Sequence, residues 1–403
     1  MKKQIILLLL IIIHLSSWSQ KTIPTDGPCT TAMAEKAKGR WIKNPDNLFT
    51  TAEQSEVFKR LDAIHQLVLK LYPEPTGVDA VWHRTNRNQF FASQLKIDYN
   101  RDGVPRRNEI NGIPVATYYY SAAFFSYFCG NKENEMYQGY PGETGTRISV
   151  YINSFDAYAG GGVDDPMTID GRPVRMRIPV RKTWKGYELL YNDEISTFRS
   201  ILIHRDGILP YIPVTRKQYL DHSIEHLNEI FDKIIKDTKE LPVRSLEEQE
   251  AEKKNKLAKF EKDFGKDPKR LKSAVDYYLS GYQTDQQRRD EQVKAQIKNK
   301  EDVLKHYQDE LENTTKDGLL DSPATVRLFH SPDAQTPVFV KEIEGGSMLV
   351  TENPAYIKKD LPKYTPQFMV LSWSWDSTPP LKKIGEIVEA NFPIEKLQAM
   401  IDK

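Results

Sequence analysis

Two histidines and a glutamate have the spacing of a metal-dependent hydrolase in the string His222-Ser-Ile-Glu-His226. On a helix, H-x-x-E-H places both imidazoles one turn apart, where they can bind zinc, and the glutamate beside them can polarise a bound water. The string therefore suggests Glu225 as a catalytic base. The zinc ligands of such a site would be His222, His226 and, further along the chain, Glu301.

The helix that must carry this string is amphipathic. Thr215 is suited to cap its start. Apolar residues recur at helical spacing at Leu220, Ile224, Leu227, Phe231 and Ile234. At about 100° per residue, the two histidines and the glutamate fall on the opposite, solvent-facing side. Zinc catalysis needs a sheltered cleft, so we favour an exposed polar helix face.

Residues 98–109, D-Y-N-R-D-G-V-P-R-R-N-E, fit the calcium-loop pattern D-x-[DN]-x-[DN]-G-x-x-x-x-x-E. The ligands would be Asp98, Asn100, Asp102, Val104 and Glu109. Three arginines within the loop offset the negative charge that attracts a dication. A glycine and a proline soon after it prevent the helix that should follow. We therefore favour a hairpin turn centred on Asp102-Gly103. Beyond zinc and calcium at these two strings, the sequence predicts no cofactor.

Two tryptophans near the end of the chain are candidates for a ligand-binding surface. In the strand-like run FMVLSWSW, Trp373 and Trp375 project to the same face as Met369 and Leu371, because side chains alternate along a strand. Paired indoles can form a flat platform for a sugar or a peptide. Alignment with aliphatic residues favours burial in the core instead.

The remaining pattern predicts an α+β fold. In residues 20–240, strand-like runs alternate with glycine and proline clusters, and residues 51–72 have the spacing of an amphipathic helix. We expect an antiparallel sheet with packed helices. Residues 320–403 form a small α+β region with further strand-like runs, which is either a separate domain or a completion of the first sheet.

Residues 245–316 differ sharply from both flanks, because lysine, glutamate and glutamine dominate them. The apolar residues thin to a near-heptad stripe at Val293, Ile297, Leu304, Tyr307 and Leu311. This composition predicts a charged helical arm, folded as a hairpin or short coiled coil that interrupts the sheet. The arm is either a partner-binding element or a solvated insertion that buries only its own seam.

The first residues, MKKQIILLLLIIIHLSSWSQ, predict export. Two lysines, the apolar run from Ile5 to Ile13 and the small-x-small triplet Ser17-Trp-Ser19 are the three parts of a secretory signal peptide, residues 1–19. The apolar run is much shorter than the roughly 20 residues of a spanning helix. We expect a periplasmic, cell-surface or extracellular protein without a transmembrane anchor after cleavage.

The cysteine count and the charge constrain the chain further. Its two cysteines, Cys29 and Cys129, can pair in an oxidising compartment or stay as buried thiols, and the sequence leaves both alternatives open.

The 57 basic and 56 acidic residues give a net charge of +1, and loss of Lys2 and Lys3 with the signal peptide makes it about −1. A nearly neutral chain does not favour a nucleic-acid partner.

Residues Pro213-Val-Thr-Arg-Lys-Gln-Tyr-Leu220, preceded by Leu209-Pro-Tyr-Ile212, resemble a P-V-T-R-K-x-Y-L stretch in uncharacterised exported proteins of Gram-negative bacteria. This resemblance implies export and no known activity. Since no catalytic set is complete, we expect an exported, non-catalytic protein that binds a peptide, a glycan or an envelope protein. The alternative is a metal-dependent hydrolase using the string at 222–226.

Overall fold

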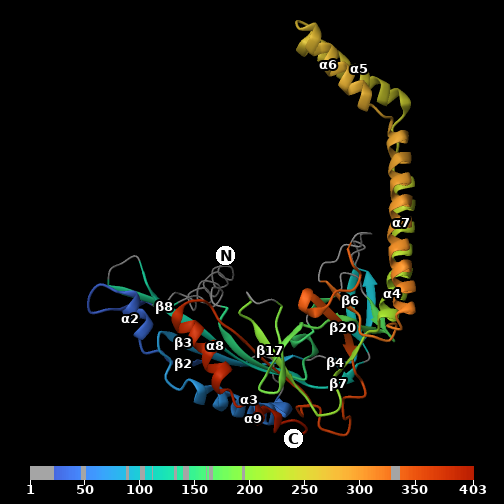
Figure 1. Cartoon of the computed structure of the whole chain (residues 1–403). Helices are drawn as coiled ribbons and strands as arrows, with labels where there is room; N and C mark the ends of the chain where they lie inside the picture. Colours follow the sequence, from blue (N-terminus) through green and yellow to red (C-terminus); the bar gives the residue numbers. More distant parts are fainter. Residues whose placement is uncertain are drawn as a thin grey trace, which may run out of the picture. The chain divides into compact units, whose positions relative to one another are not determined.

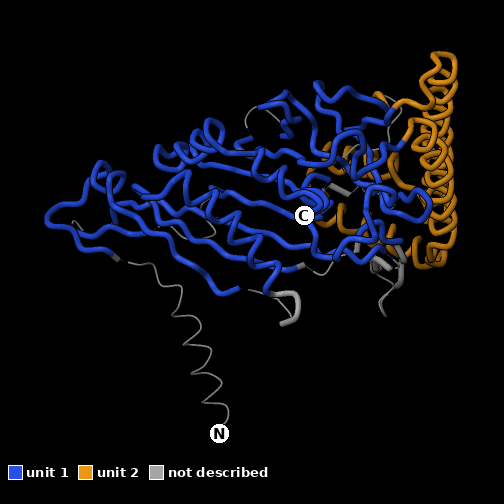
Figure 2. The backbone as a smooth tube through the Cα atoms, turned by 90° about the horizontal axis from the view of Figure 1, so that it is seen from below, with its two compact units in different colours: residues 1–214, 323–329, 339–403 blue, residues 215–322, 330–338 orange. Residues whose placement is uncertain are grey.

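Antiparallel strands and long helices make up this chain in the computed structural model (Figure 1), which confirms the α+β class predicted from the sequence. The structure describes residues 22–46, 51–87, 90–99, 105–110, 112–130, 134–138, 145–159, 161–162, 167–192, 196–327 and 336–403. The predicted signal peptide lies outside these ranges. The chain divides into a first unit, residues 1–214, 323–329 and 339–403, and a second unit, residues 215–322 and 330–338 (Figure 2).

A ten-stranded sheet forms the frame of the first unit. Its main path runs through β1 (Thr22–Pro24), β9 (Glu135–Gln138), β8 (Thr117–Cys129), β10 (Arg147–Ile152), β21 (Met369–Ser374), β17 (Arg199–Ile203), β16 (Tyr187–Leu190) and β15 (Val180–Trp184). In addition, β3 (Val78–Arg87) pairs with β8 and with β2 (Trp41–Lys43). Because β21 pairs with both β10 and β17, the last part of the chain supplies an interior strand of this sheet.

The main core of the first unit lies between this sheet and two helices. Alternate side chains of β8, such as Tyr120 and Phe124, are buried on the face covered by α3 (Thr51–Leu71) and α8 (Pro379–Asn391). The helix predicted over residues 51–72 is confirmed as α3. Its residues Leu61, Ile64 and Val68 are fully buried, as helical spacing requires of a core-facing stripe. The short α9 (Ile394–Gln398) closes the same core.

A smaller five-stranded sheet contributes a second core in the same unit. It comprises β11 (Gly161–Gly162), β14 (Arg175–Met176), β20 (Gly346–Glu352), β18 (Tyr211–Pro213) and β19 (Thr325–Arg327). Three two-stranded pairs are β12 (Thr168–Ile169) with β13 (Arg172–Pro173), β4 (Phe90–Phe91) with β7 (Ile113–Pro114), and β5 (Gln94–Tyr99) with β6 (Pro105–Ile110). Two single turns of 3-10 helix are η2 (Phe155–Ala157) and η3 (Glu342–Glu344).

A disulfide joins Cys29 and Cys129, so the pairing alternative holds in the structure. It connects the segment before α2 (Thr31–Lys36) to the end of β8. A small apolar cluster with Ala34, Tyr127 and Met136 packs around it. The bond thus holds the start of the described chain against the sheet.

Two helical hairpins form the second unit (Figure 1). Its helices are α4 (Arg216–Lys239), α5 (Leu246–Phe264), α6 (Pro268–Gly281) and α7 (Asp285–Lys316). α4 packs along α7, and α5 packs along α6. Capping boxes at Thr215, Ser245 and Thr284 start three of the helices. The sequence predicts an arm that begins at residue 245. In the structure the helical unit begins earlier, at Thr215, because α7 covers the apolar stripe of α4.

Candidate interaction surface

The two histidines of the H-x-x-E-H string lie side by side on α4. Their rings are nearly parallel, with centroids 5.7 Å apart, and both are half-buried. The sequence placed this pair on the solvent-facing side of the helix, and the half-buried rings are less exposed than that prediction implies. Glu225 is exposed, as expected, and Glu301 is exposed on α7. Within the ranges that the structure describes, no three histidine, cysteine or acidic side chains gather as a metal site.

The predicted calcium loop falls partly outside the described residues. Asn100, Asp102 and Val104 lie in the segment 100–104, about which the structure says nothing. Asp98 lies in β5 and Glu109 in β6, and these strands pair in antiparallel register. A calcium loop of this type leads into a helix that carries its last glutamate, whereas Glu109 lies in a strand. The flanking backbone is that of the hairpin alternative.

The structure places Trp373 and Trp375 in or against the main core, which is the alternative that the sequence favoured, and not on an open aromatic platform. The Trp373 indole is only 1% exposed, and it packs in the main core with its centroid 5.0 Å from that of Trp184. Trp375 lies just beyond β21 and is half-buried against Gly385 of α8. A ligand cannot stack on an indole that the core already covers, so these residues stabilise the fold.

A buried arginine in the first unit, Arg177, has acidic and phenolic partners of its own. Arg177, 5% exposed, donates hydrogen bonds of 2.7 Å to the Tyr211 hydroxyl and to Glu342 Oε1. Glu188 adds a second carboxylate at 3.6 Å. Burial raises the pKa of the neighbouring Tyr158 hydroxyl well above its ordinary value. These contacts fit a structural ion-pair cluster, in which acidic partners neutralise a buried charge.

Four serines stand in register on adjacent strands of the main sheet: Ser121, Ser149, Ser372 and Ser200. All are buried, and the first two hydroxyls lie 3.0 Å apart. The hydroxyls of Ser200 and Ser372 have no hydrogen-bond partner among the described residues. Because the row is covered, it offers no open binding face, and we assign no site to it.

His65 is a buried histidine that α3 places against the sheet. Its ring stacks on that of Trp82 at 3.8 Å, and its Nδ1 lies 3.1 Å from the Tyr120 hydroxyl oxygen. Burial lowers the pKa of His65; nearby Asp62 opposes this effect, and Arg84 and Lys43 reinforce it. The folded protein therefore holds His65 neutral at pH values where the unfolded chain is already protonated.

This lowered pKa predicts a pH-dependent stability. As the pH falls below about 6.5, the unfolded chain binds a proton that folded His65 excludes, so the free energy of unfolding decreases. This decrease continues until the pH reaches the lower pKa of the folded state. Above about pH 7 the contribution of His65 is constant. In His65→Gln the slope between about pH 5 and 7 should be smaller. Urea unfolding at several pH values measures both slopes. An unchanged slope in the variant would contradict the assignment. The pKa of His83 is also lowered, chiefly by burial, so some slope remains.

The hairpin of α5 and α6 has an unusually thin interior. Its seam consists of half-buried apolar residues: Leu257, Phe260, Phe264, Leu271, Val275 and Tyr278. Ring contacts continue along it, with 5.8 Å between the centroids of Phe260 and Tyr278. Both helices are described throughout, and Gln249 is their one buried residue. The hairpin therefore contributes little core and presents most of its surface.

A polar junction holds the base of this hairpin. The Gln249 side chain donates to the carbonyl of Arg244 at 2.7 Å and accepts from the backbone amide of Asp285 at 2.7 Å. The Arg244 guanidinium donates to the Asp285 carboxylate at 2.7 Å. Hydrogen bonding to Arg244 lowers the pKa of Asp285. The two ends of the α5/α6 hairpin are thus tied together where it meets α7.

The far end of the hairpin is strongly basic. Residues 253–272, called the basic tip below, contain nine lysine and arginine residues against three acidic residues. Lys253 pairs with Glu250, and Arg270 pairs with Asp267. The other basic residues are exposed and form no ion pair with a described residue: Lys254, Lys256, Lys259, Lys262, Lys266, Lys269 and Lys272. The tip is therefore a concentrated positive surface.

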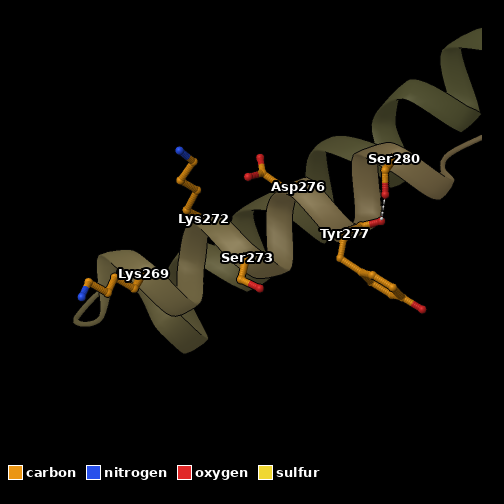
Figure 3. Close-up of a pocket in the computed structure, with 6 residues that line it drawn as sticks. All are labelled: Lys269, Lys272, Ser273, Asp276, Tyr277 and Ser280. Carbon is orange, nitrogen blue, oxygen red and sulfur yellow. Dashed lines mark hydrogen bonds between the residues drawn. The ribbon is translucent and has the colours of Figure 1, made fainter.

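One face of α6 adds exposed polar and aromatic groups (Figure 3). A shallow open hollow of about 620 Å³ is lined by Lys269, Lys272, Ser273, Asp276, Tyr277 and Ser280. All six belong to α6, so the hollow is a surface rather than an enclosed pocket. Tyr277 is 84% exposed. Tyr277 therefore presents its ring to solvent on the same face of α6 as Lys269 and Lys272.

No family model matches this chain, and neither a curated protein nor a solved structure shows significant similarity to it. None of the described helices combines the length and the apolarity needed to span a bilayer. The function of the protein must therefore be inferred from the geometry of the chain itself. The feature that the sequence analysis missed is the basic tip, because a net charge near zero averages it away. A running charge count over windows of about twenty residues would have found it.

Proposed function

We propose that this protein is exported and acts as a non-catalytic binding protein of the cell envelope, with the α5/α6 hairpin as its contact element. The observation that carries the proposal is the thin interior of that hairpin, in which Gln249 is the one buried residue. Helices of globular proteins are stabilised mainly by packing an apolar face. A hairpin that packs so little of its own surface is well suited to bind a partner.

Four further observations support this function. The predicted signal peptide and the resemblance of residues 209–220 to exported proteins favour export. The Cys29–Cys129 disulfide supports it, because such bonds persist in oxidising compartments. The exposed apolar side chains Leu246, Tyr277 and Leu279, which are 68%, 84% and 42% exposed, lie on the hairpin itself.

Removal of the hairpin tests the proposal. Because Arg244 and Asp285 meet at 2.7 Å, residues 246–283 can be replaced with a short Gly-Ser linker. We expect the mature chain to co-sediment with isolated Gram-negative cell envelopes and the shortened chain to stay in the supernatant. The contacts of α4 with α7 are outside the deletion, so the helical circular dichroism of these two helices and the unfolding of the first unit should persist.

Two results would contradict this function. One is equal co-sedimentation of the intact and shortened chains, which would move the contact away from the hairpin. The other is hydrolysis of peptides or glycans by the purified mature chain in a substrate screen, which would show catalysis. Exposed Ile297 on α7 offers a matched control, because Ile297→Ala removes an apolar side chain outside the hairpin and should leave binding unchanged.

A further inference from the structure

We infer that the partner of the basic tip is an anionic lipid bilayer. This inference rests on the proposed function and names the partner of the same hairpin. Nine basic and three acidic residues give residues 253–272 a net charge of +6. With a mature chain near −1, the rest of the molecule is net negative. The long-range field therefore orients the tip towards a negatively charged surface.

The charges of the tip are available to a partner. Seven of its lysines are exposed and form no ion pair with a described residue. The other hairpin of the same unit is different. There, several lysines pair with acids across and along the helices, as in Lys300 with Asp232 and Lys305 with Asp309, and the unpaired ones are not gathered in one cluster without such pairs. Like charges that outnumber their counter-charges repel one another, so the tip gains stability when an anionic surface neutralises it.

The composition of the tip favours lipid headgroups over nucleic acid. Eight of its nine basic residues are lysines. Base edges and single phosphates are read best by the planar fork of arginine, whereas lysine acts as a point charge. A layer of lipid phosphates is a diffuse negative surface, and four to eight basic residues on an amphipathic helix are a known pattern for binding it.

Exposed aromatic and aliphatic groups next to the tip strengthen the assignment to lipid. Tyr277 is 84% exposed and Leu279 42% exposed, and both follow the basic turns of α6. Tyrosine is enriched at the interface between headgroups and hydrocarbon. At about 1.5 Å per residue, Tyr277 lies roughly 12 Å along the helix from Lys269. Lysines and tyrosine can therefore meet one membrane surface together.

Vesicle co-sedimentation of the full mature chain tests this inference. Vesicles of phosphatidylcholine mixed with phosphatidylglycerol should bind the chain, and pure phosphatidylcholine vesicles should not. Near an anionic membrane each lysine contributes about fivefold in affinity, so K262Q/K266Q/K269Q should bind the mixed vesicles about a hundredfold more weakly. Raising the salt concentration should weaken binding of the intact chain as well.

A matched variant controls for the loss of charge alone. Lys233, Lys294 and Lys298 are exposed on α4 and α7 and form no ion pair with a described residue. K233Q/K294Q/K298Q removes the same charge and should bind the mixed vesicles as tightly as the intact chain. Equal weakening in both triple variants would overturn the inference, because the tip would then have no special role.

Two other outcomes would also overturn it. One is equal binding to mixed and to pure phosphatidylcholine vesicles. The other is tight binding of duplex DNA by the tip without binding of mixed vesicles, which would make the partner a nucleic acid. Either result leaves the proposed function intact if binding to envelopes still depends on the hairpin. Loss of that binding after protease treatment of the envelopes would then show that the partner is a protein.

Discussion

Replacing Trp373 with alanine is expected to lower the free energy of unfolding of the first unit by about 3–5 kcal/mol. The indole is 1% exposed, and it packs in the main core beside Trp184. Its loss leaves a cavity that the paired strands around β21 cannot close. Urea unfolding followed by tryptophan fluorescence measures the change, because all tryptophans after the predicted signal peptide lie in the first unit.

Trp375 supplies the matched comparison. It lies two residues further along and is half-buried, so Trp375→Ala should cost clearly less stability than Trp373→Ala. Both variants should bind envelopes as the intact chain does, since neither residue lies in the α5/α6 hairpin. If Trp373→Ala left the stability unchanged but removed the binding of a sugar or peptide, the platform hypothesis would be revived.

Reduction of the Cys29–Cys129 disulfide should also destabilise the first unit strongly. The bond spans 100 residues of sequence. On the chain-entropy model, opening a loop of that length costs about 4–5 kcal/mol, because the unfolded chain regains the freedom that the bond removed. Urea unfolding with and without a reductant measures the difference.

The double variant Cys29→Ala with Cys129→Ala separates the bond from other effects of the reductant. Its stability should equal that of the reduced protein and should not respond to further reductant. Alanine suits the small apolar cluster around Ala34 and Met136, so little packing is lost. Two free thiols in the denatured, unreduced protein would contradict the assignment.

Local patterns predicted the elements of the fold well. The apolar spacing of residues 51–72 predicted α3, because a helix of that length with one clear stripe has few alternatives. The run FMVLSWSW was expected to be a strand, and it is β21. Its interior place between β10 and β17 was only one of two alternatives, since sequence does not reveal which distant strands will pair.

Long-range partners explain the differences. Helical spacing along α4 alone predicts Ile234 in the apolar stripe. The structure instead buries Ser223 and Ile235 beside Leu220, and Ile234 is 37% exposed. The covering helix α7 begins well over forty residues later in the chain, so its contacts could not be anticipated. The basic tip was likewise invisible in the total charge, although every lysine in it was readable from the sequence.

The place of β21 also determines the order in which the first unit can fold. Strands β10 and β17 flank it, so each keeps an unpaired edge until residues 369–374 are available. These residues follow the whole helical unit along the chain, and the sheet therefore depends on contacts of very high sequence separation. A nascent chain cannot complete this sheet before residues 369–374 have been synthesised, and a copy truncated before residue 369 should aggregate through the two open edges.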